Sequence, residues 1–270
     1  QPRKVGCQGT YGSNSEMAAK ILFDKSEINF YHEFEDVFKA VENGEVDFGI
    51  LPIQNSTTGS VAQTYDLMKK YNFYIVKVVR LEISHCLAAK KGTSLSDIKA
   101  VYSHPQALWQ CSAFISKNNL TAIPHENTAT AAKLVSESDE PIAAICSKRC
   151  AELYGFDIIS DKITDSYPNY TRFICISRDF RMDEDAKSIS MLITLPNKQG
   201  SLIRLLTKFF VNGFNLEKIE SRPIAGGSFN VMFYLDFEGN IHDKKVSALL
   251  SGLKGEFESF KFLGNYSEIM

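Results

Sequence analysis

Short apolar runs alternate with helical patterns over the first two thirds of this chain, and the alternation constrains the fold more than any other feature. Apolar runs typical of strands cover residues 4–6, 29–32, 48–53, 74–83, 100–103, 121–124, 143–146 and 172–177. Between them, apolar residues such as Phe34, Val37, Phe38 and Val41 recur with the spacing of one helix face. Strands interleaved with helices predict an α/β fold with a parallel sheet covered on both faces.

The pattern changes after a charged stretch, residues 178–187, which we interpret as a solvated linker. Strict alternation of Ile189, Met191, Ile193 and Leu195 then predicts a strand with one buried face. Helical stripes and further alternating runs follow in the order β-α-β-β-α-β, which is typical of a ferredoxin-like unit. The sequence therefore predicts two domains that meet at the charged stretch.

Composition and charge argue against several classes of protein. The 30 Lys and Arg residues against 32 Asp and Glu residues leave a net charge of −2, which argues against nucleic acid as the main partner. No apolar run approaches the roughly 20 residues that span a membrane, so we expect no membrane partner. The six cysteines form no CxxC pair and the five histidines show no metal-binding spacing. We therefore expect core thiols in a reducing cytoplasm, and no metal.

Polar residues cluster just after apolar runs, where open α/β sheets bind their ligands. The clusters span residues 9–13, 52–60 and 103–106, and the first two contain Thr10 and Ser56. Their hydroxyls, amides and helix-start N–H groups suit an anion, although ordinary capping and turn formation also explain each cluster.

A further polar cluster, Asn169-Tyr170-Thr171-Arg172-Phe173, leads into a predicted strand. The planar guanidinium of Arg172 suits a carboxylate, and the alternative is an ordinary surface charge. The catalytic patterns GxSxG, Walker A and GxGxxG are absent from the chain. The residues alone indicate an anion-binding α/β domain and do not name its substrate.

The ordered set of motifs resembles that of the prephenate dehydratase family over nearly the whole chain. The motifs are Leu51-Pro52-Ile53-Gln54-Asn55-Ser56 with Gly59-Ser60, Ser103-His104-Pro105-Gln106 and Asn169-Tyr170-Thr171-Arg172-Phe173. The C-terminal part resembles an ACT domain at Gly200-Ser201-Leu202 and Glu220-Ser221-Arg222-Pro223. Residues 65–67, 84–87 and 110–111 look closest to the dehydratase portion of bifunctional chorismate mutase–prephenate dehydratases. A chain of that kind that starts without Met would lack its mutase domain.

The resemblance implies a catalytic domain similar to type 2 periplasmic binding proteins, in which two α/β lobes face a cleft. The chain would cross between the lobes near residues 81–86 and 161–167. The implied units are residues 1–180 for the catalytic domain, with lobes of about 1–83 plus 164–180 and 84–163, and residues 188–270 for the ferredoxin-like ACT domain.

The implied reaction converts prephenate to phenylpyruvate, carbon dioxide and water, a step of L-phenylalanine biosynthesis. Because the product ring is aromatic, the barrier lies in expelling hydroxide, a poor leaving group, while carbon dioxide departs. A protein lowers this barrier by donating to the hydroxyl, holding the substrate and removing water from the carboxylate. No redox step occurs, so the resemblance implies no cofactor.

The resemblance also assigns roles to residues of the cleft. Thr171 lies nearest the chemistry as a hydrogen-bond donor to the leaving hydroxyl, since a threonine hydroxyl is too weak an acid for full proton transfer. Asn55, Ser103 and Gln110 orient the substrate. Glu126 acts as a general acid only if burial raises its pKa, and caps a helix otherwise. The expected substrate-binding residues are Thr10, Gln54, Ser56, Arg172 and Phe173.

Gln54 departs from the family, which usually has glutamate at this position. Glutamine keeps an acceptor oxygen, gains two donors and cannot shuttle a proton. We expect the position to act by hydrogen bonding, because the carboxylate of Glu126 is still available for proton transfer.

The ACT resemblance implies feedback inhibition by L-phenylalanine, which binds between two paired ACT units of a homodimer or homotetramer. The helix start near residue 200 would accept the carboxylate of the ligand. The expected effector-binding residues are Gly200, Ser201, Leu202, Asn215, Leu216, Glu220 and Ser221.

Two alternative functions remain open from the sequence. An arogenate dehydratase performs the same chemistry on a side chain that carries an amine instead of a keto group. A non-catalytic amino-acid sensor would combine the same two domains, but the presence of Thr171 and Arg172 favours an enzyme.

Overall fold

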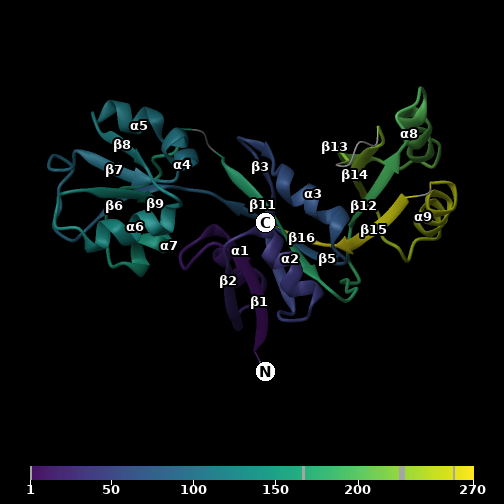
Figure 1. The fold of residues 1–270 in the computed structure, drawn as a ribbon, viewed down its shortest axis with the longest axis horizontal. Coiled ribbons are helices and arrows are strands. Elements are labelled where there is room, and N and C mark those ends of the chain that lie inside the picture. The colour runs from purple at the N-terminus through teal and green to yellow at the C-terminus, as the bar shows by residue number, and fades with distance from the viewer. Residues whose placement is uncertain (1, 166–167, 225–228, 258) are drawn as a thin grey trace.

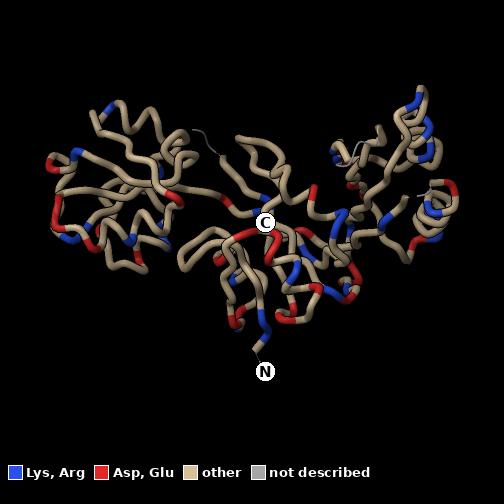
Figure 2. The backbone as a smooth tube through the Cα atoms, in the orientation of Figure 1, with Lys and Arg blue, Asp and Glu red and all other residues tan. Residues whose placement is uncertain are grey.

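Three β-sheets form the framework of the computed structural model, which describes residues 2–165, 168–224, 229–257 and 259–270. The sheets lie in a row, with that of a first lobe between those of a second lobe and a C-terminal unit (Figure 1). Charged residues of both signs are distributed over all three parts (Figure 2).

The sheet of the first lobe has the strand order β16-β5-β11-β3-β1-β2, with β4 paired to β3. Its elements are β1 (Arg3–Gln8), α1 (Asn14–Leu22), β2 (Ser26–Tyr31), α2 (Phe34–Glu42), β3 (Phe48–Asn55), β4 (Gly59–Ser60), α3 (Ala62–Lys70), β5 (Tyr74–Glu82), β11 (Tyr170–Ser177) and β16 (Glu268–Ile269). Helices cover both faces, so Val37 and Phe38 of α2 are buried on one face and Ala18 of α1 on the other.

The prediction of a parallel sheet is only partly right. Strands β1, β2 and β3 are parallel, but β11 runs antiparallel to both β3 and β5. The antiparallel direction of β11 follows from the path of the chain. β5 leads out of the first lobe, and β11 leads back into it beside β5.

The second lobe has the strand order β10-β6-β9-β7-β8. Its elements are β6 (Cys86–Ala89), β7 (Ala100–Ser103), α4 (Pro105–Gln110), α5 (Ser112–Lys117), β8 (Thr121–Pro124), α6 (Thr128–Glu137), β9 (Ala143–Cys146), α7 (Lys148–Leu153) and β10 (Asp157–Ser160). The sequence did not predict β6 or β10. All four residues of β6 are buried, and a short strand buried on both faces has no alternation to detect.

Two crossings connect the lobes, and their described residues, 83–85 in one and 161–165 with 168–169 in the other, lie side by side. The N–H of Ile83 donates to the carbonyl of Asn169 at 2.7 Å, and the N–H of Ile163 donates to the carbonyl of His85 at 3.1 Å. The two-lobed α/β architecture expected from the resemblance is therefore confirmed.

The C-terminal unit contains β12 (Ser188–Leu195), α8 (Ser201–Val211), β13 (Leu216–Pro223), β14 (Val231–Glu238), α9 (Lys244–Glu256) and β15 (Ser259–Tyr266). Its antiparallel sheet has the order β13-β14-β12-β15, which confirms the predicted ferredoxin-like βαββαβ unit. Alternating residues of β12 and β14 bury one face against α8 and α9.

The other face of the C-terminal sheet packs on the first lobe. Leu192 and Tyr234 of this sheet share one hydrophobic core with Tyr65 and Met68 of α3. Strand β15 approaches β5 so closely that a Cβ atom at Gly264 would collide with the backbone of β5. The C-terminal unit is therefore joined to the first lobe by an apolar interface.

The charged stretch 178–187 has no helix or strand, as predicted, but it is not simply solvated. Phe180 packs edge-on against Tyr74, with ring centroids 5.5 Å apart, and also contacts Phe262. Ala186 is buried. These apolar contacts attach the segment to the first lobe and the C-terminal sheet.

Other expectations from composition were checked on the described residues. All six cysteines are buried and free. Within the described ranges no helix is long and apolar enough to cross a membrane, and no group of three or more His, Cys, Asp or Glu residues is arranged to hold a metal.

Candidate active site

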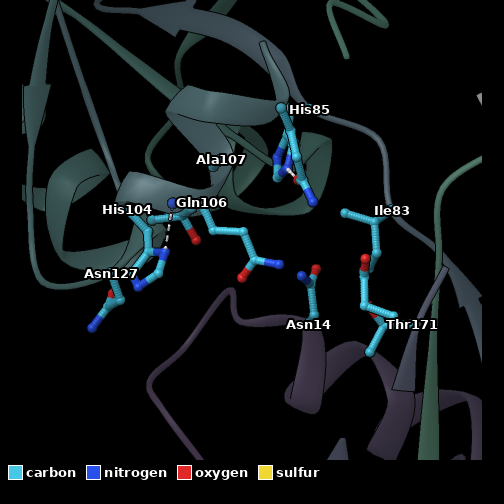
Figure 3. Close-up of a pocket in the computed structure, with 11 residues that line it drawn as sticks. Asn14, Ile83, His85, His104, Gln106, Ala107, Asn127 and Thr171 are labelled. Carbon is cyan, nitrogen blue, oxygen red and sulfur yellow. Dashed lines mark hydrogen bonds between the residues drawn. The ribbon is translucent and has the colours of Figure 1, made fainter. Parts of the chain in front are cut away.

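A cavity of about 170 Å³ lies between the two lobes, beside the crossings (Figure 3). Its walls come from both lobes, with Asn14 and Thr171 on one side and Gln106 on the other. The lining residues are Asn14, Asn55, Ile83, His85, His104, Gln106, Ala107, Gln110, Asn127, Thr128 and Thr171. This lining is polar, and among the described residues it contains no Asp, Glu, Lys or Arg.

Thr171 reaches the cavity from the start of β11, directly opposite Asn55 on β3. The amide Nδ2 of Asn55 donates to Thr171 Oγ1 at 3.0 Å. Asn55 is itself fixed, because its Oδ1 accepts from the backbone N–H groups of Thr57 and Thr58 at 2.9 and 3.1 Å. Since Asn55 donates to the threonine oxygen, the hydroxyl proton of Thr171 is free to donate into the cavity.

Gln110, at the end of α4, contacts a histidine that the sequence analysis did not assign to the site. Nε2 of His85 lies 2.9 Å from Oε1 of Gln110, and burial lowers the pKa of His85 below its ordinary value. A neutral imidazole that donates to Oε1 leaves the amide N–H groups of Gln110 available to a ligand. The signal in the sequence that could have placed His85 at the site was its position, as a polar residue within the predicted crossing 81–86.

Helix N-termini supply the positive potential of the cavity. α1 begins at Asn14 and α6 begins at Thr128, and both residues line the wall. The cap residue of α6, Asn127, accepts from the N–H of Thr130 at 2.8 Å. His104 caps α4 in the same way through Nδ1. Because helix N-termini carry partial positive charge, the cavity suits an anionic ligand without an ionised lining residue.

Comparison with known proteins identifies the family. The prephenate dehydratase family profile matches residues 5–181, which include the cavity-lining residues of both lobes. The chain belongs to the prephenate dehydratase family. The resemblance stated from the motifs is thereby confirmed, as is the interpretation of the chain as an enzyme of this kind.

Known relatives match nearly all of this chain. Arogenate dehydratase/prephenate dehydratase 1 of Arabidopsis thaliana is 38% identical, covering 97% of this chain and 71% of the relative. The bifunctional chorismate mutase/prephenate dehydratase of Enterobacter agglomerans is 33% identical, with 97% and 70% covered. A prephenate dehydratase from Arthrobacter aurescens, solved in complex with L-phenylalanine, superposes with a TM-score of 0.90 at 30% identity, covering 98% and 89%.

Two residues expected in the prephenate dehydratase site lie elsewhere in the second lobe. Ser103 is buried, and its hydroxyl donates to the carbonyl of Ile145 at 2.6 Å, so it joins β7 to β9. The Glu126 side chain is 65% exposed and contacts Nε2 of His32 from the first lobe at 3.3 Å. The burial required for Glu126 to act as a general acid is therefore absent from this arrangement.

Three further residues of the motifs do not line the cavity, which corrects the expectation that they bind substrate there. Arg172 pairs with Asp236 of the C-terminal sheet at 3.1 Å. Gln54 is the cross-strand neighbour of Arg172 and lies on the same side. Phe173 is buried in the core of the first lobe. Neighbouring strand residues point to opposite faces, so Arg172 and Gln54 cannot share the face used by Thr171 and Asn55.

Thr10 and Ser56 also lie outside the cavity lining. The hydroxyl of Thr10 is 3.5 Å from the carbonyl of Tyr11. Ser56 Oγ accepts from the N–H of Tyr170 at 2.8 Å and holds the loop after β3 against the start of β11. At Thr10 and Ser56 the two polar clusters therefore form turns, which was the alternative explanation that the sequence left open.

The residues expected to bind the effector are divided between two faces of the C-terminal unit. Gly200 caps α8 with a left-handed φ of 84°, and Ser201 and Leu202 form the first turn of that helix. Asn215 and Leu216 stand at the start of β13. Glu220 accepts a hydrogen bond from Ser60 of the first lobe at 2.6 Å, and its neighbour Ser221 lies on the opposite face of β13.

Proposed function

We propose that the cavity between the lobes is the site where prephenate loses its ring hydroxyl and carbon dioxide to give phenylpyruvate, with Thr171 as the donor to the leaving hydroxyl. The observation that carries the proposal is the Thr171 hydroxyl on the cavity wall, held from behind by Asn55 Nδ2 at 3.0 Å. Two lobes and their crossings enclose the position where the substrate would react.

Thr171 acts by hydrogen bonding rather than by complete proton transfer, so the ring oxygen leaves as hydroxide and becomes water by taking a proton from the solvent. The Thr171 proton points to the departing oxygen, while the Asn55 amide stabilises negative charge that develops on Oγ1. Holding the ring hydroxyl at this position also orients the carboxylate that leaves as carbon dioxide. Thr171 and Asn55 therefore form one donor unit.

The helix N-termini bind the dianionic substrate. The N-termini of α1 and α6 face the cavity, and Asn14, Asn127 and Gln106 add neutral donors beside them. Neutral donors and helix N-termini attract the carboxylates of the substrate. A fixed ion pair would instead stabilise the carboxylate and oppose its departure as uncharged carbon dioxide.

The same lining favours prephenate over arogenate. The side chain of arogenate carries an ammonium group, and a cation next to a helix N-terminus is unfavourable. The described lining residues contain no carboxylate that would offset this cost. Turnover of the two substrates by the purified protein, followed by release of phenylpyruvate or phenylalanine, tests this preference directly.

We further propose that L-phenylalanine binds the C-terminal unit and inhibits the reaction, and that two copies of the chain pair through this unit. The solved relative in complex with L-phenylalanine supports the ligand. Large apolar side chains on α8 support the pairing, since Ile203, Phe210 and Val211 are 68%, 83% and 67% exposed. The deciding assay measures phenylpyruvate formation from prephenate with and without L-phenylalanine, alongside the mass of the protein in solution.

A further inference from the structure

Strand β11 connects the cavity to the C-terminal sheet through two consecutive residues. Thr171 faces the cavity, and Arg172 faces Asp236 on β14. The guanidinium Nη1 donates to Asp236 Oδ2 at 3.1 Å, and the side chains are only 13% and 1% exposed. An ion pair that is this buried is weakly screened by solvent, so it constrains the backbone of Arg172.

Asp236 is held in turn by a buried network of hydroxyl groups. Ser190 on β12 donates to Asp236 Oδ1 at 2.5 Å. The Ser190 hydroxyl also contacts the hydroxyls of Tyr234 and Tyr266 at 2.9 and 2.6 Å. The carboxylate that receives Arg172 is therefore fixed to the interior of the C-terminal sheet.

A second carboxylate contacts the same guanidinium, whose buried Nε has no hydrogen-bond partner among the described residues. Glu268 on β16 lies 3.2 Å from Arg172 Nη2 and accepts from Arg80 Nε at 3.0 Å. Arg80 is the cross-strand neighbour of Arg172 on β5. Glu268 is more exposed than Asp236 and is shared between two arginines, so Asp236 provides the firmer contact.

The strand pairing beside Thr171 is irregular. The register between β11 and β3 shifts between Arg172 and Phe173, immediately after the pair formed by Arg172 and Gln54 and one residue beyond Thr171. Such irregularities interrupt the ladder and re-aim neighbouring side chains. On its other edge β11 pairs in register with β5 at Thr171 and Arg172, so the side-chain contacts of Arg172 add to that pairing where the ladder to β3 is interrupted.

We propose that Asp236 is a positioning residue for the dehydration: by holding Arg172 it fixes Thr171 Oγ1 against Asn55, and it makes the catalytic strand sensitive to the state of the C-terminal unit. This inference rests on the proposed role of Thr171. It gives Arg172 a function that does not involve the substrate.

The first test compares two carboxamide variants at the same interface. Asp236→Asn should lower kcat about tenfold or more while KM changes less than about threefold, since a small misplacement of a reacting group costs rate rather than binding. Asp66→Asn is the matched control, because Asp66 on α3 accepts from Arg222 of the C-terminal unit at 2.8 and 2.9 Å but does not touch β11. It should leave kcat within about twofold. Equal losses in both variants would overturn the proposal in favour of a general effect of domain docking.

Asp236→Asn leaves a buried guanidinium with a weaker partner, so folding is checked by circular dichroism and thermal unfolding. If that variant does not fold, Arg172→Met takes its place, because it keeps an unbranched side chain of similar length and loses the contact to Asp236. A folded Arg172→Met variant with unchanged kcat would contradict the proposal.

A double-mutant cycle then separates this inference from the role of Thr171. Once Thr171→Ala has removed the hydroxyl, Asp236→Asn should lower kcat by less than about twofold further, because residues that act as one unit are not additive. Multiplicative losses would show that Asp236 acts elsewhere and would leave Thr171 in its proposed role. Normal turnover of Thr171→Ala alone would instead refute the proposed role of Thr171, and the positioning role of Asp236 with it.

Discussion

At the scale of single residues, the proposed mechanism depends on one hydroxyl, that of Thr171, and on the groups that surround it. Thr171 alone is a poor acid, but Asn55 Nδ2 lies 3.0 Å from its oxygen and is fixed by two backbone N–H groups. A donor held in this way needs no reorganisation when charge develops on the leaving oxygen. His85 fixes Gln110 in a similar way, because Nε2 of His85 lies 2.9 Å from Oε1 of Gln110.

Thr171→Ala should lower kcat by about 10²–10⁴-fold, the usual contribution of a group that assists proton transfer, with a much smaller change in KM. Thr171→Ser keeps the hydroxyl and should retain most of the activity, whereas Thr171→Val keeps the shape and should not. Steady-state assays of phenylpyruvate formation provide the measurement. Near-normal turnover in the valine variant would remove the hydroxyl from the mechanism.

Gln54→Glu should change turnover by less than about tenfold, which corresponds to roughly 1.4 kcal/mol of barrier. The reason is its position, because Gln54 lines a separate cavity with Arg80 and Arg172 under the C-terminal sheet and does not face Thr171. The assay is the same, with Gln54→Ala as the control for lost packing. A hundredfold gain in the glutamate variant would show that the natural enzyme is impaired at this position.

At the scale of elements, the cavity is lined by helix N-termini with their partial positive charge, whereas other anion sites are lined by charged side chains. α1 and α6 direct their N-termini to the cavity, and their cap residues Ser13 and Asn127 satisfy N–H groups of the first turns. Strand β11 has a second role, because its alternation places the Thr171 hydroxyl on the cavity side and Arg172, which joins the strand to the C-terminal sheet, on the other side. One strand therefore serves both the cavity and the domain interface.

Two substitutions of Asn127 should separate capping from substrate binding. Asn127→Ala removes the acceptor for the N–H of Thr130 and should lower the free energy of unfolding by about 1 kcal/mol. Asn127→Asp preserves the cap but places a negative charge in the cavity, so it should leave stability nearly unchanged and raise KM about tenfold, or roughly 1.4 kcal/mol of binding. Urea unfolding and steady-state kinetics measure the two effects. An unchanged KM in the aspartate variant would place the substrate elsewhere.

At the scale of the whole molecule, the C-terminal unit is bound to the first lobe over an interface with an apolar core and ion pairs around it. Tyr234 and Tyr65 pack edge-on with ring centroids 4.9 Å apart, and Arg222 pairs with Asp66. Lys261 on β15 donates to the carbonyl of Met68 at 2.9 Å. The C-terminal sheet is therefore in direct contact with the first lobe and is not connected to it by the linker alone.

L-Phenylalanine should bind the protein and inhibit it, with a coupling free energy of about 1–3 kcal/mol between effector and substrate. Calorimetry gives the affinity, and titration in the presence of a substrate analogue gives the coupling. Phe210→Glu, on the exposed face of α8, should weaken both the pairing of two copies and the inhibition while the basal rate stays within about twofold. Absence of any heat of binding by the natural chain would contradict the regulatory proposal.

The sequence by itself determined most of the order of elements and, through the motifs, three of the residues that line the cavity. Helical spacing predicted α2, strict alternation predicted β12, and the resemblance assigned Asn55, Gln110 and Thr171 to one cleft. These features depend on local periodicity and on residue types, and both can be read from a single chain.

Only the tertiary structure decided which neighbour of each motif faces the cavity. Alternation requires Thr171 and Arg172 to point in opposite directions, but it does not state which of the two faces is the cleft. The answer depends on the C-terminal sheet, which packs on one side of β11 and supplies Asp236 to the arginine. The same reason explains why His85 was missed, because its contact with Gln110 exists only when a crossing segment meets the end of α4. Contacts between distant segments carry no local pattern, so the fold alone assigns them.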